Sequence, residues 1–383
     1  MSNDDLVDLR AFRRELHRHP ETRFDVPVTA GRVAERLRAA GLDVAVGVGG
    51  SGVVATLRRG GGHRSIGLRA DLDALPIRER SEVSYASGME GVHHGCGHDG
   101  HTTMLVGAAT ALADMGDLDG TVHFVFQPSE EDGRGAQAMI DDGLFDRFPM
   151  DAVFGLHNLP GLPVGHLATR PDVFTTFEEV FAVELVGSGG HASAPERTVD
   201  PLVAGAELVM ALQSIVSRAL APGDHGVVSV TEFVTDGARN IIPSNVTIRG
   251  DIRGYDDRVS ATIRTRMQQI ADGVAAAHGA TARVDHTRDF ASVVNTPAET
   301  EEAARAARRV EGTSVDAAAD RVGFSEDFAQ YLHHRPGCLV LLGNGTDGAN
   351  GRSLHHPAYD FNDDALPFGI EYWCQLVRGR LVR

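Results

Sequence analysis

Glu179 to Val186 read EVFAVELV, a run rich in Val, Phe and Leu that predicts a β-strand. The residues that follow predict a helix, two strands, a second helix and a last strand, at 200–220, 227–234, 246–252, 257–278 and 281–285. The first helix opens on Asp200-Pro201, a good cap and first-turn pair. The order β-α-β-β-α-β is the split-βαβ, or ferredoxin-like, plan. We therefore predict a self-contained α+β domain over residues 176–290.

The chain on either side of this segment has a different rhythm, in which short strands alternate with helices. Strands are predicted at 53–57, 66–70, 121–126, 152–156 and 338–342. Helices are predicted at 6–17, 28–40, 101–115, 136–144, 298–310, 325–332 and 364–381. This alternation is typical of an α/β sheet covered by helices on both faces. Residues 1–175 and 291–383 are therefore expected to form one discontinuous domain of three α/β/α layers, into which the α+β domain is inserted.

The composition excludes several classes of protein. All 36 basic residues of the 383-residue chain are arginine, which rules out a Walker A loop and a lysine Schiff base. The net charge of -17 argues against nucleic acid or an anionic membrane as a partner. Three cysteines suit a reducing compartment, and the first residues lack an apolar signal region. We expect a cytoplasmic protein without a membrane span.

The densest chemical signal is HHGCGHDGH at residues 93–101, just before a predicted helix. Cys96 and His98 stand one residue apart in a glycine-flanked turn, whose backbone can bend so that both side chains converge. A thiolate and an imidazole together suit Zn, and also Co, Fe or Mn. The motif therefore predicts a metal site.

A second signal is QPSEED at residues 127–132, which follows a predicted strand. The adjacent carboxylates of Glu130 and Glu131 point in different directions at a strand end, so one can bind metal while the other faces a substrate. Water activated by a metal beside a carboxylate is the usual arrangement for hydrolysis. Taken alone, such a cluster is more often a solvated turn.

Further polar residues follow other predicted strands or lie in loops. His157 ends one strand, His355 lies in a loop, and Asp71 and Asp73 end another strand. In an open α/β sheet, ligands bind outside the carboxyl ends of the strands, so these segments are expected to meet there. An aspartate that orients a ligating histidine is a common device, and it is the role expected of Asp71 and Asp73.

Eight motifs occur in a fixed order along nearly the whole chain: RADLDALPI, HHGCGHDGHT, FQPSEE, GLHN, GSGGHASAP, RNIIPSN, GFSEDF and LHHPAYDFND. Together they resemble the aminoacylase/carboxypeptidase metallohydrolases, in particular the amidohydrolase branch that includes hippurate hydrolase and the auxin-conjugate hydrolases. Each motif is weak by itself, whereas the ordered set is specific. The resemblance implies a catalytic domain with a dinuclear metal centre and an inserted ferredoxin-like domain that is often used for dimerisation.

The resemblance also implies roles for individual residues. Glu130 would be the general base and then the acid for the leaving amine. His191 would stabilise the oxyanion, and Asn240 and Arg253 would contact a substrate carboxylate. Asp73 would belong to the catalytic group, and with Asp71 would lie behind the ligands. The implied metal ligands are Cys96, His98, Glu131, His157 and His355.

One position departs from the family's pattern. Relatives carry a histidine after the proline of the GGHASAP motif, whereas here Pro195 is followed by Glu196. A glutamate facing the site would favour a cationic group on the substrate, and a glutamate facing solvent would have no such effect. The substrate class therefore stays open at this position.

The leading hypothesis is a metal-dependent amidohydrolase that removes the acyl group from N-acyl amino acids. A dipeptidase or exo-carboxypeptidase on the same scaffold is the alternative. An assembly module without activity would require lost ligands, and a dehydrogenase would require a glycine fingerprint that opens a helix. Two divalent ions are expected, with Zn, Mn, Co and Ni all compatible, in a homodimer or homotetramer formed through the inserted domain.

Overall fold

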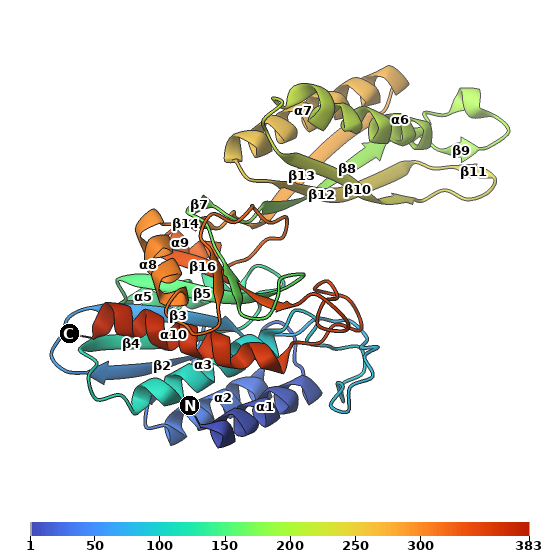
Figure 1. Cartoon of the computed structure of the whole chain (residues 1–383). Helices are drawn as coiled ribbons and strands as arrows, with labels where there is room; N and C mark the ends of the chain where they lie inside the picture. The colour runs from blue at the N-terminus through green and yellow to red at the C-terminus, as the bar shows by residue number, and fades with distance from the viewer. Residues whose placement is uncertain (1, 383) are drawn as a thin grey trace. The chain divides into compact units, whose positions relative to one another are not determined.

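Figure 1 shows the computed structural model of the chain, which describes residues 2–382. The chain forms two compact units. The first unit, called the catalytic unit after the domain expected from the sequence, holds residues 2–174, 293–321 and 326–382, and the second unit holds residues 175–292 and 322–325. The sequence prediction assigns residues 322–325 to the first domain, but they bond to the second. Thr176 N–H donates to the Phe324 carbonyl at 3.1 Å, and Tyr255 Oη–H to the Val322 carbonyl at 3.2 Å.

An eight-stranded mixed sheet is the centre of the catalytic unit. Its strands β3, β4, β5 and β16 run parallel to their neighbours in the middle of the sheet, whereas β1 and β2 are antiparallel. In spatial order the strands are β1 (Asp43–Val48), β2 (Gly52–Arg59), β4 (Gly120–Gln127), β3 (Ser65–Asp71), β5 (Ala152–Pro160), β16 (Gly337–Gly345), β6 (His166–Ala168) and β15 (Ser314–Asp316). The predicted α/β class is confirmed.

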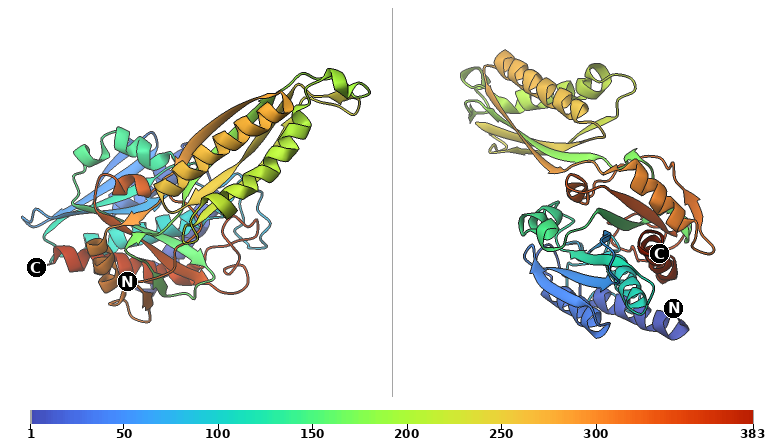
Figure 2. Two further views of the ribbon diagram at one scale, coloured as in Figure 1. Left: turned by 90° about the horizontal axis from the view of Figure 1, so that it is seen from above. Right: turned by 90° about the vertical axis from the view of Figure 1, so that its left-hand side faces the viewer.

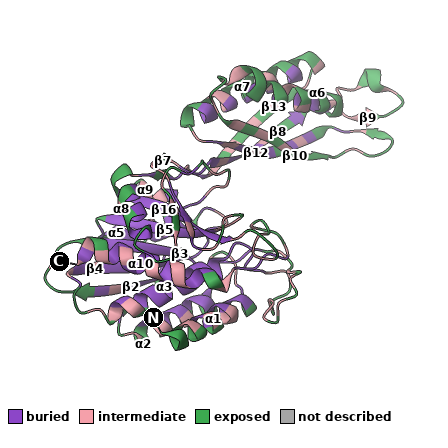
Figure 3. Ribbon diagram, viewed as in Figure 1, coloured by how far each residue is buried: buried purple, intermediate pink, exposed green. Residues whose placement is uncertain are grey.

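Helices cover both faces of this sheet. One face packs on α1 (Asn3–Arg18), α2 (Pro27–Ala39), α3 (His98–Ala113), α8 (Pro297–Ala307) and α10 (Leu366–Leu381) in a single hydrophobic core. The other face carries α4 (Gly135–Asp141), α5 (Leu144–Arg147) and α9 (Ala329–Leu332). On β5, Phe154 and Leu156 point into the first core, so Gly155 between them faces the other side of the sheet. A Cβ at Gly155 would lie 3.2 Å from the ring of Phe328 on that side. The central strands and α3 are the most buried elements (Figure 3).

Short elements complete the catalytic unit. The two-residue strand β7 (Asp172–Val173) pairs with β14 (Val294–Asn295) where the chain leaves and re-enters the unit. A 3-10 turn, η3 (Asp363–Ala365), leads into α10. The Arg13 guanidinium of α1 donates to Asp363 at 2.8 Å, which ties the first helix to the start of the last one.

The second unit has the predicted β-α-β-β-α-β order. Its sheet has the order β10-β12-β8-β13, and all neighbouring pairs are antiparallel. Helices α6 and α7 lie side by side on one face of it (Figure 2). The elements are β8 (Phe177–Val186), β9 (Gly190–His191), η1 (Pro195–Arg197), α6 (Pro201–Ser214), η2 (Ile215–Ala219), β10 (Gly226–Thr235), β11 (Ile241–Ile242), β12 (Asn245–Gly254), α7 (Asp257–His278) and β13 (Thr281–Phe290).

One helical stretch among the described residues, Pro201–Ala219, is long and apolar enough to cross a membrane by length and composition. The sequence predicts a helix at 200–220 and no stretch apolar enough to span a membrane. Leu208 and Leu212 pack in the core of the second unit, whereas Val203 and Met210 are exposed. The stretch therefore has one buried and one exposed apolar side.

Two predicted helices are wrong in extent. The helix expected at 325–332 covers only Ala329–Leu332, because Glu326 turns back to accept from Phe328 N–H at 3.1 Å and Asp327 accepts from Ala136 N–H at 2.9 Å. The helix expected at 136–144 is divided into α4 and α5 by Gly143, which has φ of 79°. Strand β1 was not predicted, since its apolar residues lie among glycines.

Candidate metal centre

The carboxyl ends of three parallel strands carry the candidate site. Asp71 ends β3, Glu130 and Glu131 lie in the turn after β4, and His157 lies on β5. Helix α3 begins at His98, directly after Gly97, which has φ of 87°. A Cβ at Gly97 would lie 2.4 Å from the Asn158 side-chain nitrogen, so only glycine lets this turn approach β5.

The donor atoms of all five predicted ligands gather at this place. Cys96 Sγ lies 3.5 Å from His157 Nε2, and His98 Nε2 lies 3.8 Å from Glu131 Oε1. Glu131 Oε2 lies 3.3 Å from His355 Nε2. The loop of His355 is tied to the site, because its backbone N–H donates to the Gly95 carbonyl at 2.8 Å. Ligand atoms about 2.0–2.3 Å from one ion lie about 3.3–3.8 Å apart in tetrahedral geometry, so these separations suit divalent cations.

Backbone carbonyls orient the imidazoles toward the other donors. Nδ1–H of His98 donates to the Asp73 carbonyl at 2.7 Å, and Nδ1–H of His157 donates to the Asn158 carbonyl at 2.7 Å. Each ring therefore presents its unprotonated Nε2 to the site. His98 Nε2 and Glu131 Oε1 are buried and have no hydrogen-bond partner among the described residues. A buried polar atom without a partner costs free energy, and metal binding would remove that cost. The residues present therefore fit a metal centre.

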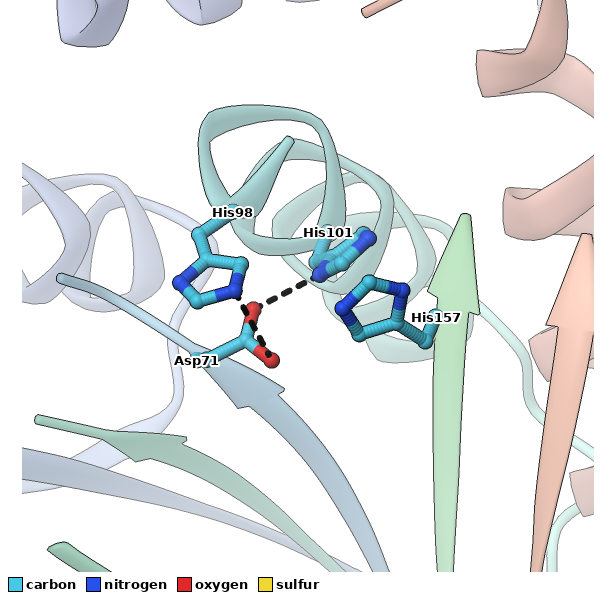
Figure 4. A group of neighbouring side chains, drawn as sticks. All are labelled: Asp71, His98, His101 and His157. Carbon is cyan, nitrogen blue, oxygen red and sulfur yellow. Dashed lines mark hydrogen bonds and ion pairs between the residues drawn. The ribbon is translucent and has the colours of Figure 1, made fainter. Parts of the chain in front are cut away.

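The two predicted supporting aspartates act at different places. The Asp73 carboxylate accepts from the backbone N–H groups of Glu130 at 3.0 Å and of Glu131 at 3.3 Å, which fixes both glutamates. The Asp71 carboxylate accepts from His101 Nδ1–H at 2.7 Å and lies 3.8 Å from His98 Nε2 (Figure 4). Asp73 therefore fixes the turn of the two glutamates, whereas Asp71 orients His101 and lies beside Nε2 of His98.

His101 lies close to His98 and His157 in Figure 4, but both of its ring nitrogens are already occupied. Nδ1–H donates to Asp71, and Nε2 accepts from Asn158 N–H at 2.8 Å. His101 is therefore a positioning residue. His101 is part of the motif at 93–101, but no role is predicted for it from the sequence. Nothing in the motif itself distinguishes His101 from His98.

The site carries an excess of buried negative charge. Arg69 pairs with Asp71, Glu326 and Asp327, at 2.8, 3.0 and 3.0 Å. Burial raises the pKa of Glu130, and the charges of Glu326 and Glu131 raise it further. Glu326 and Asp327 belong to the GFSEDF motif, to which the sequence analysis gave no role. A surplus of carboxylates in a buried site favours divalent cations.

The sequence comparisons agree with this geometry. Residues 67–379 match Peptidase family M20/M25/M40. The chain belongs to this family. It is 35% identical to hippurate hydrolase of Campylobacter jejuni over 97% of each chain, and 34% identical to N-acetylcysteine deacetylase of Bacillus subtilis over 96% of this chain and 95% of the relative. A solved dinuclear metal-binding M20 peptidase of Bacillus subtilis superposes with a TM-score of 0.85, at 29% identity and 98% coverage of each chain. The resemblance inferred from the motifs is thus confirmed.

The other predicted site residues of this M20 chain belong to the second unit. His191 on β9 pairs with Ile241 on β11, and the Asn240 carbonyl accepts from Ala192 N–H at 3.1 Å, so His191 and Asn240 share one ribbon. Arg253 on β12 pairs with Glu178 at 2.8 Å and with Asp251 at 2.9 Å. Its charge is already matched within the unit.

Glu196, the residue that departs from the M20 pattern, lies on η1 of the second unit. Its side chain is exposed within that unit and lies 3.5 Å from Arg197 Nε. The structure shows no buried partner that would fix its direction among the described residues.

Proposed function

We propose that this chain hydrolyses the amide bond of N-acyl amino acids, releasing the acyl group. The observation that carries the proposal is that a thiol, three imidazoles and a carboxylate converge at one place, where His98 Nε2 and Glu131 Oε1 are buried without a hydrogen-bond partner among the described residues. Glu130 Oε2 lies 3.8 Å from His98 Nε2. We assign two divalent ions, Zn, Mn, Co or Ni, to these ligands: Cys96, His98, Glu131, His157 and His355. When bound, such ions lower the pKa of water and polarise the substrate carbonyl.

Glu130 is the proposed proton carrier. Asp73 holds its backbone, and burial together with the nearby carboxylates raises its pKa. A raised pKa makes the carboxylate a better base toward water and lets the resulting acid give its proton to the leaving nitrogen. An amide nitrogen must receive a proton before it can leave as an amine, so one residue serves both transfers.

His191 and Asn240 are the proposed substrate contacts of the second unit. His191 Nδ1 accepts from Ser193 Oγ–H at 2.7 Å and from Ser193 N–H at 3.1 Å, so its Nε2 carries the proton and can donate to an oxyanion. Such a donor supplies about 3 kcal/mol of transition-state stabilisation. Asn240 is the proposed donor to the substrate carboxylate. The ion pairs of Arg253 weigh against the same role for that residue.

We also propose that the chain is a cytoplasmic homodimer or homotetramer formed through the second unit. Exposed apolar side chains on α6, η2 and β10 support an interface there, namely Val203, Met210, Val216, Phe233 and Val234. The three cysteines are free and buried, which suits a reducing compartment. Met210→Asp would shift the protein toward the monomer in sedimentation if this face is the interface, whereas an unchanged mass would reject it.

The family name favours one alternative, a dipeptidase or exo-carboxypeptidase on the same scaffold. The two functions differ in whether the substrate carries a free amino group or an acyl chain. Glu196 would favour the peptidase if it faced the substrate, because it would pair with a free ammonium group.

A substrate and metal panel tests the proposal. The protein is stripped with a chelator and restored with Zn, Mn, Co or Ni. It is then offered acetyl, benzoyl and indoleacetyl amino acids beside plain dipeptides. Turnover of acylated substrates that depends on added metal supports the amidohydrolase. Turnover of free dipeptides alone replaces it with the peptidase, and turnover by the stripped protein rejects the metal assignment.

A further inference from the structure

A second cluster of ligand-type side chains lies in the catalytic unit, apart from the five proposed ligands. His17 on α1 has its Nε2 3.2 Å from Glu79 Oε1, and His93 has its Nδ1 3.5 Å from Glu79 Oε2. One donor atom from each residue lies within 4.8 Å of the other two. We propose that His17, Glu79 and His93 bind one divalent transition-metal ion of the zinc class, a third ion per chain.

The separations of the donor atoms fit such an ion. Ligands about 2.0–2.2 Å from zinc lie about 3.3–3.6 Å apart in tetrahedral geometry. The observed distances, 3.2 Å from His17 Nε2 to Glu79 Oε1 and 3.5 Å from His93 Nδ1 to Glu79 Oε2, are close to these values. Two imidazoles and one carboxylate form a donor set that zinc accepts, with the remaining position available to water.

The ring of His17 is already held in the orientation of a ligand. Its Nδ1 lies 2.8 Å from Asp99 Oδ2, so Nδ1–H donates to this carboxylate and Nε2 faces Glu79. A carboxylate behind a ligating imidazole is the usual support in zinc sites. Glu79 is fixed as well, because it accepts from Ser87 N–H at 2.6 Å and from the Ser81 hydroxyl.

His93 supplies an independent observation. Its side chain is fully buried, and neither ring nitrogen has a hydrogen-bond partner among residues 2–382. Two backbone hydrogen bonds of 3.0 Å with Leu75 fix the position of the His93 main chain in the interior. A buried imidazole without a hydrogen-bond partner costs free energy. A metal ion on Nδ1 would remove part of this cost.

The charges around the cluster also suit a cation. Arg13 lies beside His17, but it already pairs with Asp99, Asp360 and Asp363, at 3.3, 3.0 and 2.8 Å. The positive charge of Arg13 is therefore compensated by these three carboxylates. The ion-pair partners of Glu79 are the imidazoles of His17 and His93. A divalent ion at Glu79 would join α1 to the loop of His93, three residues before Cys96. The expected role is structural, and the inference does not rest on the proposed function.

Metal counting on the full chain tests the proposal. The protein is saturated with Zn, freed of excess ion and analysed by mass spectrometry of its elements. We expect three ions per chain in the wild type and two in His93→Met, which replaces the imidazole by an apolar side chain. The matched control is His123→Met, which removes a buried imidazole from β4 outside every cluster and should keep three.

The same number of ions in His93→Met as in the wild type would overturn the proposal. If His93→Met gives no cooperative thermal transition, Glu79→Gln replaces it, with the same expected loss of one ion. Cobalt separates the two sites, because only the centre with Cys96 gives a thiolate-to-metal charge-transfer band. Loss of that band and of turnover would mark failure of the proposed function, whereas loss of one ion with the band intact marks the third site.

Discussion

Glu130 shows how much chemistry depends on the surroundings of a single side chain. Its backbone is held by Asp73, and its carboxylate lies next to Glu131 and the Glu326–Asp327 pair. We expect Glu130→Ala to keep its bound metal and to lose turnover by about 10²–10⁴-fold, as is usual when a general base is removed. Metal analysis and kcat measured on the same sample check this. Turnover within about tenfold of wild type would contradict the role of Glu130 as the base.

Cys96 should differ from the two other buried cysteines. Its sulfur lies among His157, Glu131 and His355, whereas Cys338 and Cys374 lie in the hydrophobic core. We expect Cys96→Ala to lose metal and activity together. Cys338→Ala is the matched control and should lose only stability. Full metal occupancy in Cys96→Ala would remove this residue from the proposed ligands.

His123 makes the free energy of unfolding depend on pH. Burial lowers its pKa to about 4, while its Nε2–H donates to the Pro149 carbonyl at 3.1 Å. Between pH 6.5 and about 4, His123 is protonated in the unfolded chain but neutral in the folded chain. Stability is therefore lost as the pH falls from 6.5 to about 4, by up to about 3 kcal/mol.

His123→Gln should lose less stability than the wild type across this interval. Chelator-treated samples are compared by urea unfolding at pH 7, 5.5 and 4.5, so that release of metal does not contribute. Parallel losses in the two proteins would show that His123 titrates normally in the folded state.

At the scale of elements, helix α3 depends on its close approach to the C-terminal loop. A Cβ at Gly100 would lie 2.3 Å from the ring of Phe361, so Gly100→Ala must displace that ring. We expect a loss of about 1–3 kcal/mol in the free energy of unfolding, as in other overpacked cores.

Gly31 on α2 provides the matched control, because a Cβ there has no atom within 4 Å. Gly31→Ala should gain about 0.5–1 kcal/mol, since alanine favours a helix interior. Thermal unfolding of both variants tests the pair. A stable Gly100→Ala would mean that Phe361 can move aside at little cost.

At the scale of the whole molecule, His191 is a residue of the second unit to which we assign a role in turnover. His191 belongs to the second unit and presents a protonated Nε2. If it contacts the developing oxyanion, His191→Ala should lower kcat by about 10²–10³-fold with a much smaller change in KM. Steady-state kinetics on the substrate found by the panel check this. A change in KM alone would move His191 to substrate binding in the ground state.

Much of the fold and of the candidate site could be predicted from the sequence. Periodicity and caps predicted the β-α-β-β-α-β unit, because the spacing of apolar residues along a helix or strand is a local property. The resemblance of the ordered motifs implied five metal ligands, and the structure places their side chains close together; their role as ligands stays a prediction. The helix predicted at residues 325–332 was wrong in extent, because Glu326 and Asp327 are buried against Arg69. These two residues lie 257 and 258 positions from Arg69 along the chain.

The sequence by itself therefore determined the elements, the α/β class and the residue types available for a metal centre. Only the tertiary structure decided that His98 Nε2 has no hydrogen-bond partner among the described residues, that His101 is occupied by Asp71 and Asn158, and that His17 and His93 meet at Glu79. The reason is physical. The free-energy cost of burying a polar group depends on partners that packing brings from distant parts of the chain, and no local pattern records them.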